Sequence, residues 1–211
     1  MGRRVPLLAT LVLAAYFGTL AILAGASAHR LLLAVRSFRA RGRRLSPIAP
    51  VAEAHWPRVV VQLPLYNERF VAERAIDAAA ALGYPHDRLE IQVLDDSTDE
   101  TVAIVARAVA RWAGEGITIR HLRRPDRVGF KAGALAQGLA ATSAELVAIF
   151  DADFSPSPSF LRAAVATLLS DPGLGLVQAR WAHANAAASW LTRVQALLLE
   201  AHFRIEHRGR D

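Results

Sequence analysis

Two aspartates separated by one residue, Asp151 and Asp153, follow the apolar run in the segment ELVAIFDADFSPSPSF. In an extended chain, side chains two positions apart point to the same side, so both carboxylates can face one cation. Carboxylate oxygens, with phosphate oxygens completing the shell, suit Mg²⁺ or Mn²⁺. Asp153 could instead serve the helix expected after the Ser-Pro-Ser-Pro segment, but capping gives Asp151 no role. The spacing therefore predicts that Asp151 and Asp153 bind Mg²⁺ or Mn²⁺.

Polar side chains also end two earlier apolar runs. Tyr66 and Glu68 end the run RVVVQLPLYNE, and Asp95 and Asp96 end the run LEIQVLDDS. The acidic residues of the second run could simply cap the next helix and interact with its dipole, and the residues alone leave both readings open. If these runs are neighbouring strands, all four side chains can converge with the two aspartates on one cleft.

Lys131 is the only lysine of the sequence, whose other basic side chains are arginine and histidine. A compact ammonium at the start of a helix suits a phosphate oxygen, and the helix N-terminus adds its own N–H groups. Gly129 and Gly133 flank this lysine and could let the backbone approach a ligand. The ordinary alternative is a solvated surface lysine; we predict phosphate contact.

The hydrophobic pattern of the sequence predicts the helices and strands that position these side chains. Apolar, β-branched runs predict strands, and apolar positions at helical spacing predict helices. Asn67 can cap the first helix. The strands are expected at 58–64, 89–97, 117–122, 145–153 and 174–181, and the helices at 70–82, 100–112, 131–141 and 160–170.

Strands that alternate with helices, and that are nearly all apolar, predict an α/β fold. Its sheet is expected to be mostly parallel, with helices on both faces. Ligands of such sheets bind beyond the carboxyl ends of the strands, which is where the polar residues accumulate.

Composition narrows the class of protein. The chain has 211 residues, no cysteine and a formal net charge of +6. Without cysteine there is neither a disulfide framework nor a thiolate site. The basic excess is concentrated in one segment, so we expect no nucleic-acid partner. Its arginines are Arg30, Arg36, Arg39, Arg41, Arg43 and Arg44.

An uncharged apolar run from 5 to 28 precedes these arginines. It exceeds the roughly 20 residues that a helix needs to cross a bilayer, so residues 1–36 are expected to form a transmembrane helix with its flanks. A cleaved signal peptide is the alternative. The positive-inside rule places the later residues in the cytoplasm. The high alanine and arginine content suggests a bacterial source, so the membrane is expected to be the bacterial inner membrane. A basic, proline-containing linker is expected at 37–57 and a folded domain at 58–211.

Several motifs together resemble glycosyltransferase family 2, and most of all the cellulose synthase-like glucan and mannan synthases. They are VQLPLYNE, IQVLDDSTDET, RVGFKAGAL, VAIFDADF and LVQARWAHAN. The resemblance implies a GT-A fold and an inverting transferase. Its donor would be a nucleotide-diphosphate sugar, UDP-glucose or GDP-mannose, and its acceptor a growing β-glycan at the membrane.

The same resemblance implies roles for individual residues. Tyr66 and Glu68 would line the nucleoside site, and Asp95 or Asp96 would hold the edge of the base. Lys131 would meet the diphosphate, and Asp151 and Asp153 would bind the metal. Residues 178–181 would form the floor below the sugar.

The resemblance covers only the donor-binding part of such a synthase. The family's acidic base motif and its QxxRW motif come later, so the catalytic base is expected beyond Asp211 and this chain is expected to bind nucleotide without transfer. Its last segment predicts an amphipathic helix that faces the core, in preference to membrane or partner binding. Three alternatives stay open: a lipid (ceramide or polyprenyl phosphate) acceptor, a non-catalytic membrane-anchored binding module, and a haloacid-dehalogenase-like phosphatase, for which Ser155 stands near the place of a motif threonine.

Overall fold

The computed structural model describes residues 7–39, 51–201 and 203. By their contacts the residues fall into two compact units, one of Ile48–Val177 and one that combines Met1–Pro47 with Gln178–Asp211. Neither unit coincides with the domain 58–211 expected from the sequence, and the bounds of that domain stay a prediction. Most of the expected linker lies outside the described residues, as do the arginines Arg41, Arg43 and Arg44.

Helix α1, Leu7–Arg39, contains the apolar run from residue 7 onward. Its segment Leu7–Arg36 is 30 residues long, with a mean hydropathy of 2.2 and none of its apolar window buried. At 1.5 Å per residue this segment is roughly 45 Å long, more than the roughly 30 Å of bilayer hydrocarbon. By length and composition it can span a membrane, a test that a signal sequence near the N-terminus also passes.

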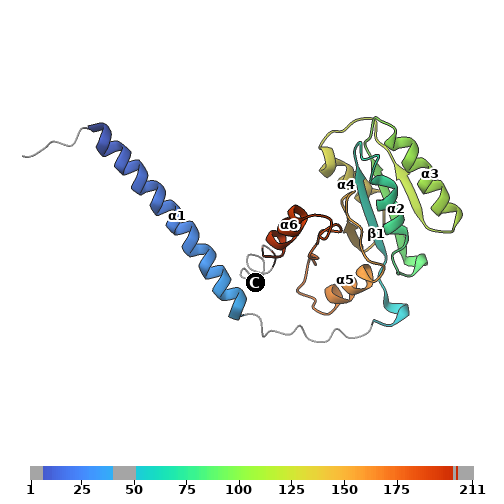
Figure 1. The fold of residues 1–211 in the computed structure, drawn as a ribbon. Helices are drawn as coiled ribbons and strands as arrows, with labels where there is room; N and C mark the ends of the chain where they lie inside the picture. Colours follow the sequence, from blue (N-terminus) through green and yellow to red (C-terminus); the bar gives the residue numbers. More distant parts are fainter. Residues whose placement is uncertain (1–6, 40–50, 202, 204–211) are drawn as a thin grey trace, which may run out of the picture. The chain divides into compact units, whose positions relative to one another are not determined.

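The unit Ile48–Val177 is built on a parallel sheet with the strand order β3-β2-β1-β4 (Figure 1). Central strand β1, Val59–Leu65, pairs in parallel with β2, Leu89–Asp95, over its whole length. On its other side β1 pairs with β4, Leu146–Ile149, from Val59 to Gln62. Strand β3, Ile119–Leu122, pairs with β2. This confirms the parallel α/β sheet predicted from the sequence.

One face of the sheet is covered by α2, Ala72–Ala80, α3, Thr101–Gly114, and α5, Phe160–Leu169. The inward side chains of β1 and β2 alternate with side chains of the opposite face, as the strand period of two requires. The buried cluster on this face includes Val59, Val61, Leu63, Leu65, Ile76, Leu82, Ile91, Val93, Val105, Leu161 and Val165.

The other face is covered by α4, Phe130–Ala140 (Figure 1). Beneath it Gln62 and Gln92 are buried, and Gln62 Nε2 donates to Gln92 Oε1 at 3.0 Å. A Cβ built on Gly138 would lie 2.6 Å from Gln62 Nε2 and 2.7 Å from Gln92 Oε1. Only glycine therefore lets α4 approach this polar pair so closely.

The residues just before β1 belong to the folded unit. Trp56 is buried, its ring lies 5.5 Å from the ring of Tyr84, and its carbonyl accepts from Arg88 Nη1 at 2.6 Å. The end of the expected linker is thus packed against the unit that holds the sheet.

One expectation for the later chain is wrong, because residues 174–181 form no strand. Helix α6, Trp190–Ala201, lies in the other compact unit, so the prediction that it faces the core of the sheet stays a prediction. An alternating apolar pattern forms a strand only where a neighbouring strand offers its hydrogen bonds, and the pattern alone does not supply that neighbour.

Candidate active site

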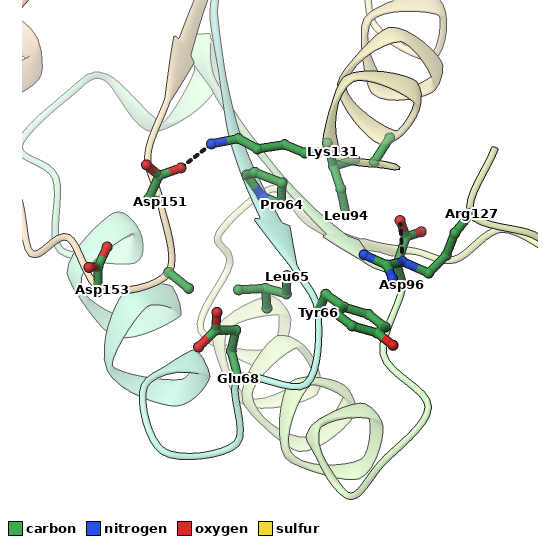
Figure 2. A pocket seen from close by; sticks show the side chains of 12 residues that line it. Pro64, Leu65, Tyr66, Glu68, Leu94, Asp96, Arg127, Lys131, Asp151 and Asp153 are labelled. Carbon is green, nitrogen blue, oxygen red and sulfur yellow. Dashed lines mark hydrogen bonds and ion pairs between the residues drawn. The ribbon is translucent and has the colours of Figure 1, made fainter. Parts of the chain in front are cut away.

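A cleft of about 390 Å³ lies at the carboxyl ends of β1 and β2, between the start of α4 and the turn after β4 (Figure 2). This is the edge at which parallel α/β sheets bind ligands. Every residue assigned to the site from the sequence lines the cleft except Asp95. The lining consists of Pro64, Leu65, Tyr66, Glu68, Leu94, Asp96, Arg127, Lys131, Ala134, Asp151, Ala152 and Asp153.

Asp151 and Asp153 both line the cleft, but not for the reason expected. Strand β4 ends at Ile149, and the N–H of Phe154 donates to the carbonyl O of Asp151 at 3.0 Å. The two aspartates therefore lie in a turn rather than in an extended chain. The turn brings both carboxylates to one side of the cleft (Figure 2).

A metal at this place would need further ligands. Among the residues that the structure describes, no group of three acidic, histidine or cysteine side chains could hold an ion. Two carboxylates facing an open cleft nevertheless match the donor set of Mg²⁺ or Mn²⁺ when phosphate oxygens and water supply the remainder. The residues therefore fit a metal that binds together with a phosphorylated ligand.

Lys131 lies at the start of α4, and its ammonium forms an ion pair with Asp151 (Figure 2). Both side chains are about half exposed, so an anion or a cation from solvent can compete for either partner. The preceding residues Gly129 and Phe130 have positive φ, 73° and 48°. At Gly133 a Cβ would overlap the carbonyl O of Val128. Gly133 is thus required by the protein's own loop, and the approach of a ligand to its backbone stays a prediction.

Asp95 is turned away from the cleft. Its side chain is fully buried, Oδ2 lies 2.8 Å from Nε2 of His121, and Oδ1 accepts from the N–H of Ser97 at 2.9 Å. Burial alone would raise the pKa of Asp95, but the hydrogen bonds from His121 and Ser97 outweigh it and lower the pKa. Of the two aspartates proposed for the base edge, the structure places Asp96 in the cleft and Asp95 behind it.

Asp96 is held by Arg124, a residue that sequence reasoning missed. Nε and Nη2 of Arg124 donate to the two carboxylate oxygens at 2.7 Å and 2.6 Å. Arg124 also donates to the carbonyls of Val128 and Phe130, both at 2.8 Å. With only 9% of the Arg124 side chain exposed, this guanidinium joins the end of β2 to the start of α4. It therefore fixes Asp96 relative to Lys131.

Tyr66 is exposed toward the cleft, and the guanidinium of Arg127 lies 3.3 Å from the centre of its ring (Figure 2). Arg127 was also missed, although it stands in the same RVGFK motif as Lys131. Glu68 lines the cleft on the side of Tyr66.

Asn67 joins the two loops that carry these residues. Its N–H donates to Ser97 Oγ and its Oδ1 accepts from the N–H of Thr98, both at 2.9 Å. Helix α2 begins at Ala72 without a side-chain cap, so the prediction that Asn67 caps this helix is wrong. Asp99 does serve the next helix, because its Oδ1 accepts from the N–H of Thr101 at 3.0 Å.

Comparison with known proteins matches this arrangement to one family. The family model described as glycosyl transferase family 2 matches residues 60–208, which include all of the sheet except Val59 and every residue that lines the cleft. The chain belongs to glycosyl transferase family 2. This assignment confirms the resemblance drawn from the motifs and replaces the phosphatase alternative.

Similar family 2 proteins include plant enzymes and a solved archaeal structure. The chain is 48% identical over 160 residues to "Glucomannan 4-beta-mannosyltransferase 2" of Arabidopsis thaliana, covering 74% of this chain and 30% of that protein. It is 42% identical over 184 residues to "Probable glucomannan 4-beta-mannosyltransferase 6" of rice, covering 82% of this chain and 32% of that protein. The chain thus spans about a third of the length of these relatives.

The solved structure is a mannosyltransferase of Pyrobaculum calidifontis in complex with GDP-Man and Mn²⁺. It superimposes with a TM-score of 0.61 at 34% identity, covering 74% of this chain and 44% of that one. This likeness confirms the GT-A type of α/β fold expected from the sequence.

Residues 178–181 of this family 2 chain lie in the other compact unit, so their place below a sugar stays a prediction. Four carboxylates line the cleft together with Lys131 and Arg127, and these side chains could exchange partners with an incoming ligand. That set suits a ligand that carries phosphates together with a cation.

Proposed function

We propose that the protein is an inverting mannosyltransferase that takes its sugar from GDP-mannose and adds it to a growing β-1,4-linked glycan. The observation that carries the proposal is the cleft, where an aromatic ring, a lysine and two carboxylates meet at the ligand-binding edge of the sheet. The choice of donor is supported by the archaeal structure that holds GDP-Man and Mn²⁺. The glycan acceptor is supported by the names of the plant relatives.

Asp151 and Asp153 would hold Mn²⁺ or Mg²⁺ between their carboxylates and the donor diphosphate. When bound, such an ion stabilises the negative charge that develops on the leaving phosphate. Lys131 would leave Asp151 and donate to a phosphate oxygen, which adds a second positive charge where it is needed. The ion pair seen between Lys131 and Asp151 would thus be replaced by two stronger charge pairs on ligand binding.

The opposite side of the cleft would receive the nucleoside. Tyr66 offers a ring on which a base can stack, and Glu68 lies near it for the nucleoside. The carboxylate oxygens of Asp96 accept hydrogen bonds from Arg124 and can accept further ones from a ligand. Guanine presents two N–H groups on one edge, so it is well suited to such a carboxylate.

An inverting transfer also needs a base to take the proton of the acceptor hydroxyl. No side chain of the cleft is assigned that role. Asp151 and Asp153 would be occupied by the metal, and Asp96 by Arg124.

Binding of the donor by the purified chain tests the proposal. We expect GDP-mannose to bind in the presence of Mn²⁺ by isothermal titration, to bind more weakly in EDTA, and to bind more tightly than UDP-glucose. Asp151→Asn and Asp153→Asn should each weaken the Mn²⁺-dependent binding at least tenfold, since loss of even an outer-shell partner of a metal costs about 10- to 100-fold. Glu115→Gln, an exposed acid after α3, is the matched control. Equal binding with and without Mn²⁺, or tighter binding of UDP-glucose, would contradict the proposed donor site.

We also propose that α1 anchors the protein in the membrane with the unit Ile48–Val177 in the cytoplasm. Arg36 and Arg39 lie in the last turn of α1, which the positive-inside rule places on the cytoplasmic side. Because the sequence contains no cysteine, one introduced on α3 by Ala103→Cys can report the side. A membrane-impermeant maleimide should label it only after the bacterial cells are lysed, and labelling of intact cells would show the opposite orientation.

A further inference from the structure

Two arginines at the cleft, Arg124 and Arg127, differ sharply in how they are held. Arg124 makes four hydrogen bonds, two of them to the carboxylate of Asp96. Arg127 Nε is buried and has no hydrogen-bond partner among the residues that the structure describes. Arg127 Nε lies 3.8 Å from Asp96 Oδ2, which is an ion pair but too long for a hydrogen bond. Arg124 is thus fixed, and Arg127 is held much less firmly.

Besides its ion pair with Asp96, Arg127 contacts two aromatic rings. Its guanidinium lies 3.3 Å from the centre of the Tyr66 ring and 5.4 Å from that of Phe130 (Figure 2 shows the Tyr66 contact). Cation–π contacts at partly exposed sites are weak, and 34% of the Arg127 side chain is exposed. A buried donor without a partner is itself unfavourable, so Arg127 gains a hydrogen bond if it moves to an acceptor.

Tyr66 is the only aromatic side chain among the residues that line the cleft. A nucleobase that stacks in this cleft would use the ring surface that the Arg127 guanidinium now covers. The base and Arg127 therefore compete for the same surface. The same binding event brings phosphates into the cleft, where Arg127 and Lys131 are both lining residues.

We propose that Arg127 acts as a gate on the nucleobase site: it lies over Tyr66, as in this structure, and moves to the diphosphate when the base stacks on that ring. The proposal rests on the function proposed above, because it needs a nucleoside diphosphate as ligand. Asp96 does not lose its charge partner when Arg127 leaves, because Arg124 already contacts both of its oxygens. The gate makes a base without phosphates a poor ligand, since such a ligand displaces Arg127 and offers it no new acceptor.

Opposite effects on guanosine and GDP would identify such a gate. In Arg127→Ala the ring is uncovered, so guanosine should bind about 2- to 5-fold more tightly, the equivalent of a surface cation–π contact. GDP with Mn²⁺ should bind about tenfold more weakly, because a charge-assisted hydrogen bond to phosphate is lost. Arg127→Lys should also bind guanosine more tightly, because an ammonium cannot stack flat on the ring, and should keep part of the GDP affinity.

Isothermal titration of the purified full chain in detergent gives both affinities. Arg107→Ala, which removes an exposed arginine of α3, is the control and should change neither. Unchanged or weaker guanosine binding by both Arg127 variants, while the unaltered chain binds GDP, overturns the gate alone and would show that Arg127 supports the stacked base instead. Failure of the unaltered chain to bind GDP refutes the proposed function, and the gate with it.

Discussion

Gly138 provides a direct test of how α4 is positioned on the sheet. A methyl group at this position would lie 2.6 Å from Gln62 Nε2, 2.7 Å from Gln92 Oε1 and 2.9 Å from Leu94 Cδ2. All three neighbours are buried, and the two glutamines hydrogen-bond to each other, so none can move aside freely. Gly138→Ala must therefore shift α4 or break the hydrogen bond between the glutamines.

The balance of free energies gives the expected sign. Alanine favours the helix over glycine by about 1 kcal/mol. Overpacking of a buried contact costs about 1–3 kcal/mol, and a buried amide left without its partner costs about as much again. We expect Gly138→Ala to lower the free energy of unfolding by about 3 kcal/mol. Gly114→Ala is the control: a Cβ there meets nothing within 4 Å, so the same substitution should leave stability unchanged or raise it slightly.

Urea unfolding followed by tryptophan fluorescence measures the effect. Trp181 and Trp190 lie outside the unit Ile48–Val177 and should first be replaced by Phe, so that the signal comes from Trp56 and Trp112. A midpoint for Gly138→Ala equal to or above that of its parent, at an unchanged slope, would refute the close approach of α4 to the two glutamines.

Two further predictions concern the residues behind the cleft. Arg124→Lys keeps the charge, but a lysine cannot reach both oxygens of Asp96 and two carbonyls at once. This variant should still unfold cooperatively and should bind GDP about tenfold more weakly, whereas Arg107→Lys should bind GDP normally. Equal GDP affinities of Arg124→Lys and the unaltered chain would show that Arg124 does not position the site. The lowered pKa of Asp95 contributes stability that is present above its ordinary pKa of 3.8 and is lost as the pH falls through the folded value. Asp95→Asn should therefore lower the free energy of unfolding by about 1–3 kcal/mol near neutral pH. The variant should also lose less stability than the unaltered chain as the pH falls, and parallel plots of unfolding free energy against pH would contradict this.

The sequence predicted the elements of the sheet well, because their apolar runs are bounded by glycine, proline and polar residues. The four strands β1–β4 and the helices α2–α5 all lie where the pattern placed them, to within a few residues. The strand expected at 174–181 failed because strand propensity does not show which neighbour will pair with it.

The site was predicted by residue type more successfully than by geometry. Six of the seven assigned side chains line the cleft, since parallel strands bring their carboxyl ends together. Arg124 and Arg127 were missed because arginine is common throughout this sequence, so neither stood out. Their position between the strand that ends at Leu122 and the helix that begins at Phe130 was the available signal.

The pairing of β1 also has a consequence for the order in which the protein is made and folds. Val59 pairs with Leu89 on one side and with the much later Leu146 on the other. The pairing of β1 with β2 joins seven residue pairs and closes a short loop. The pairing of β1 with β4 joins only four residue pairs and closes a far longer loop. Loop closure costs entropy, so the second pairing should form later and open more readily. During synthesis from the N-terminus, the half of the cleft that holds Tyr66 and Asp96 can thus be complete while the half that holds Asp151 is still to be translated.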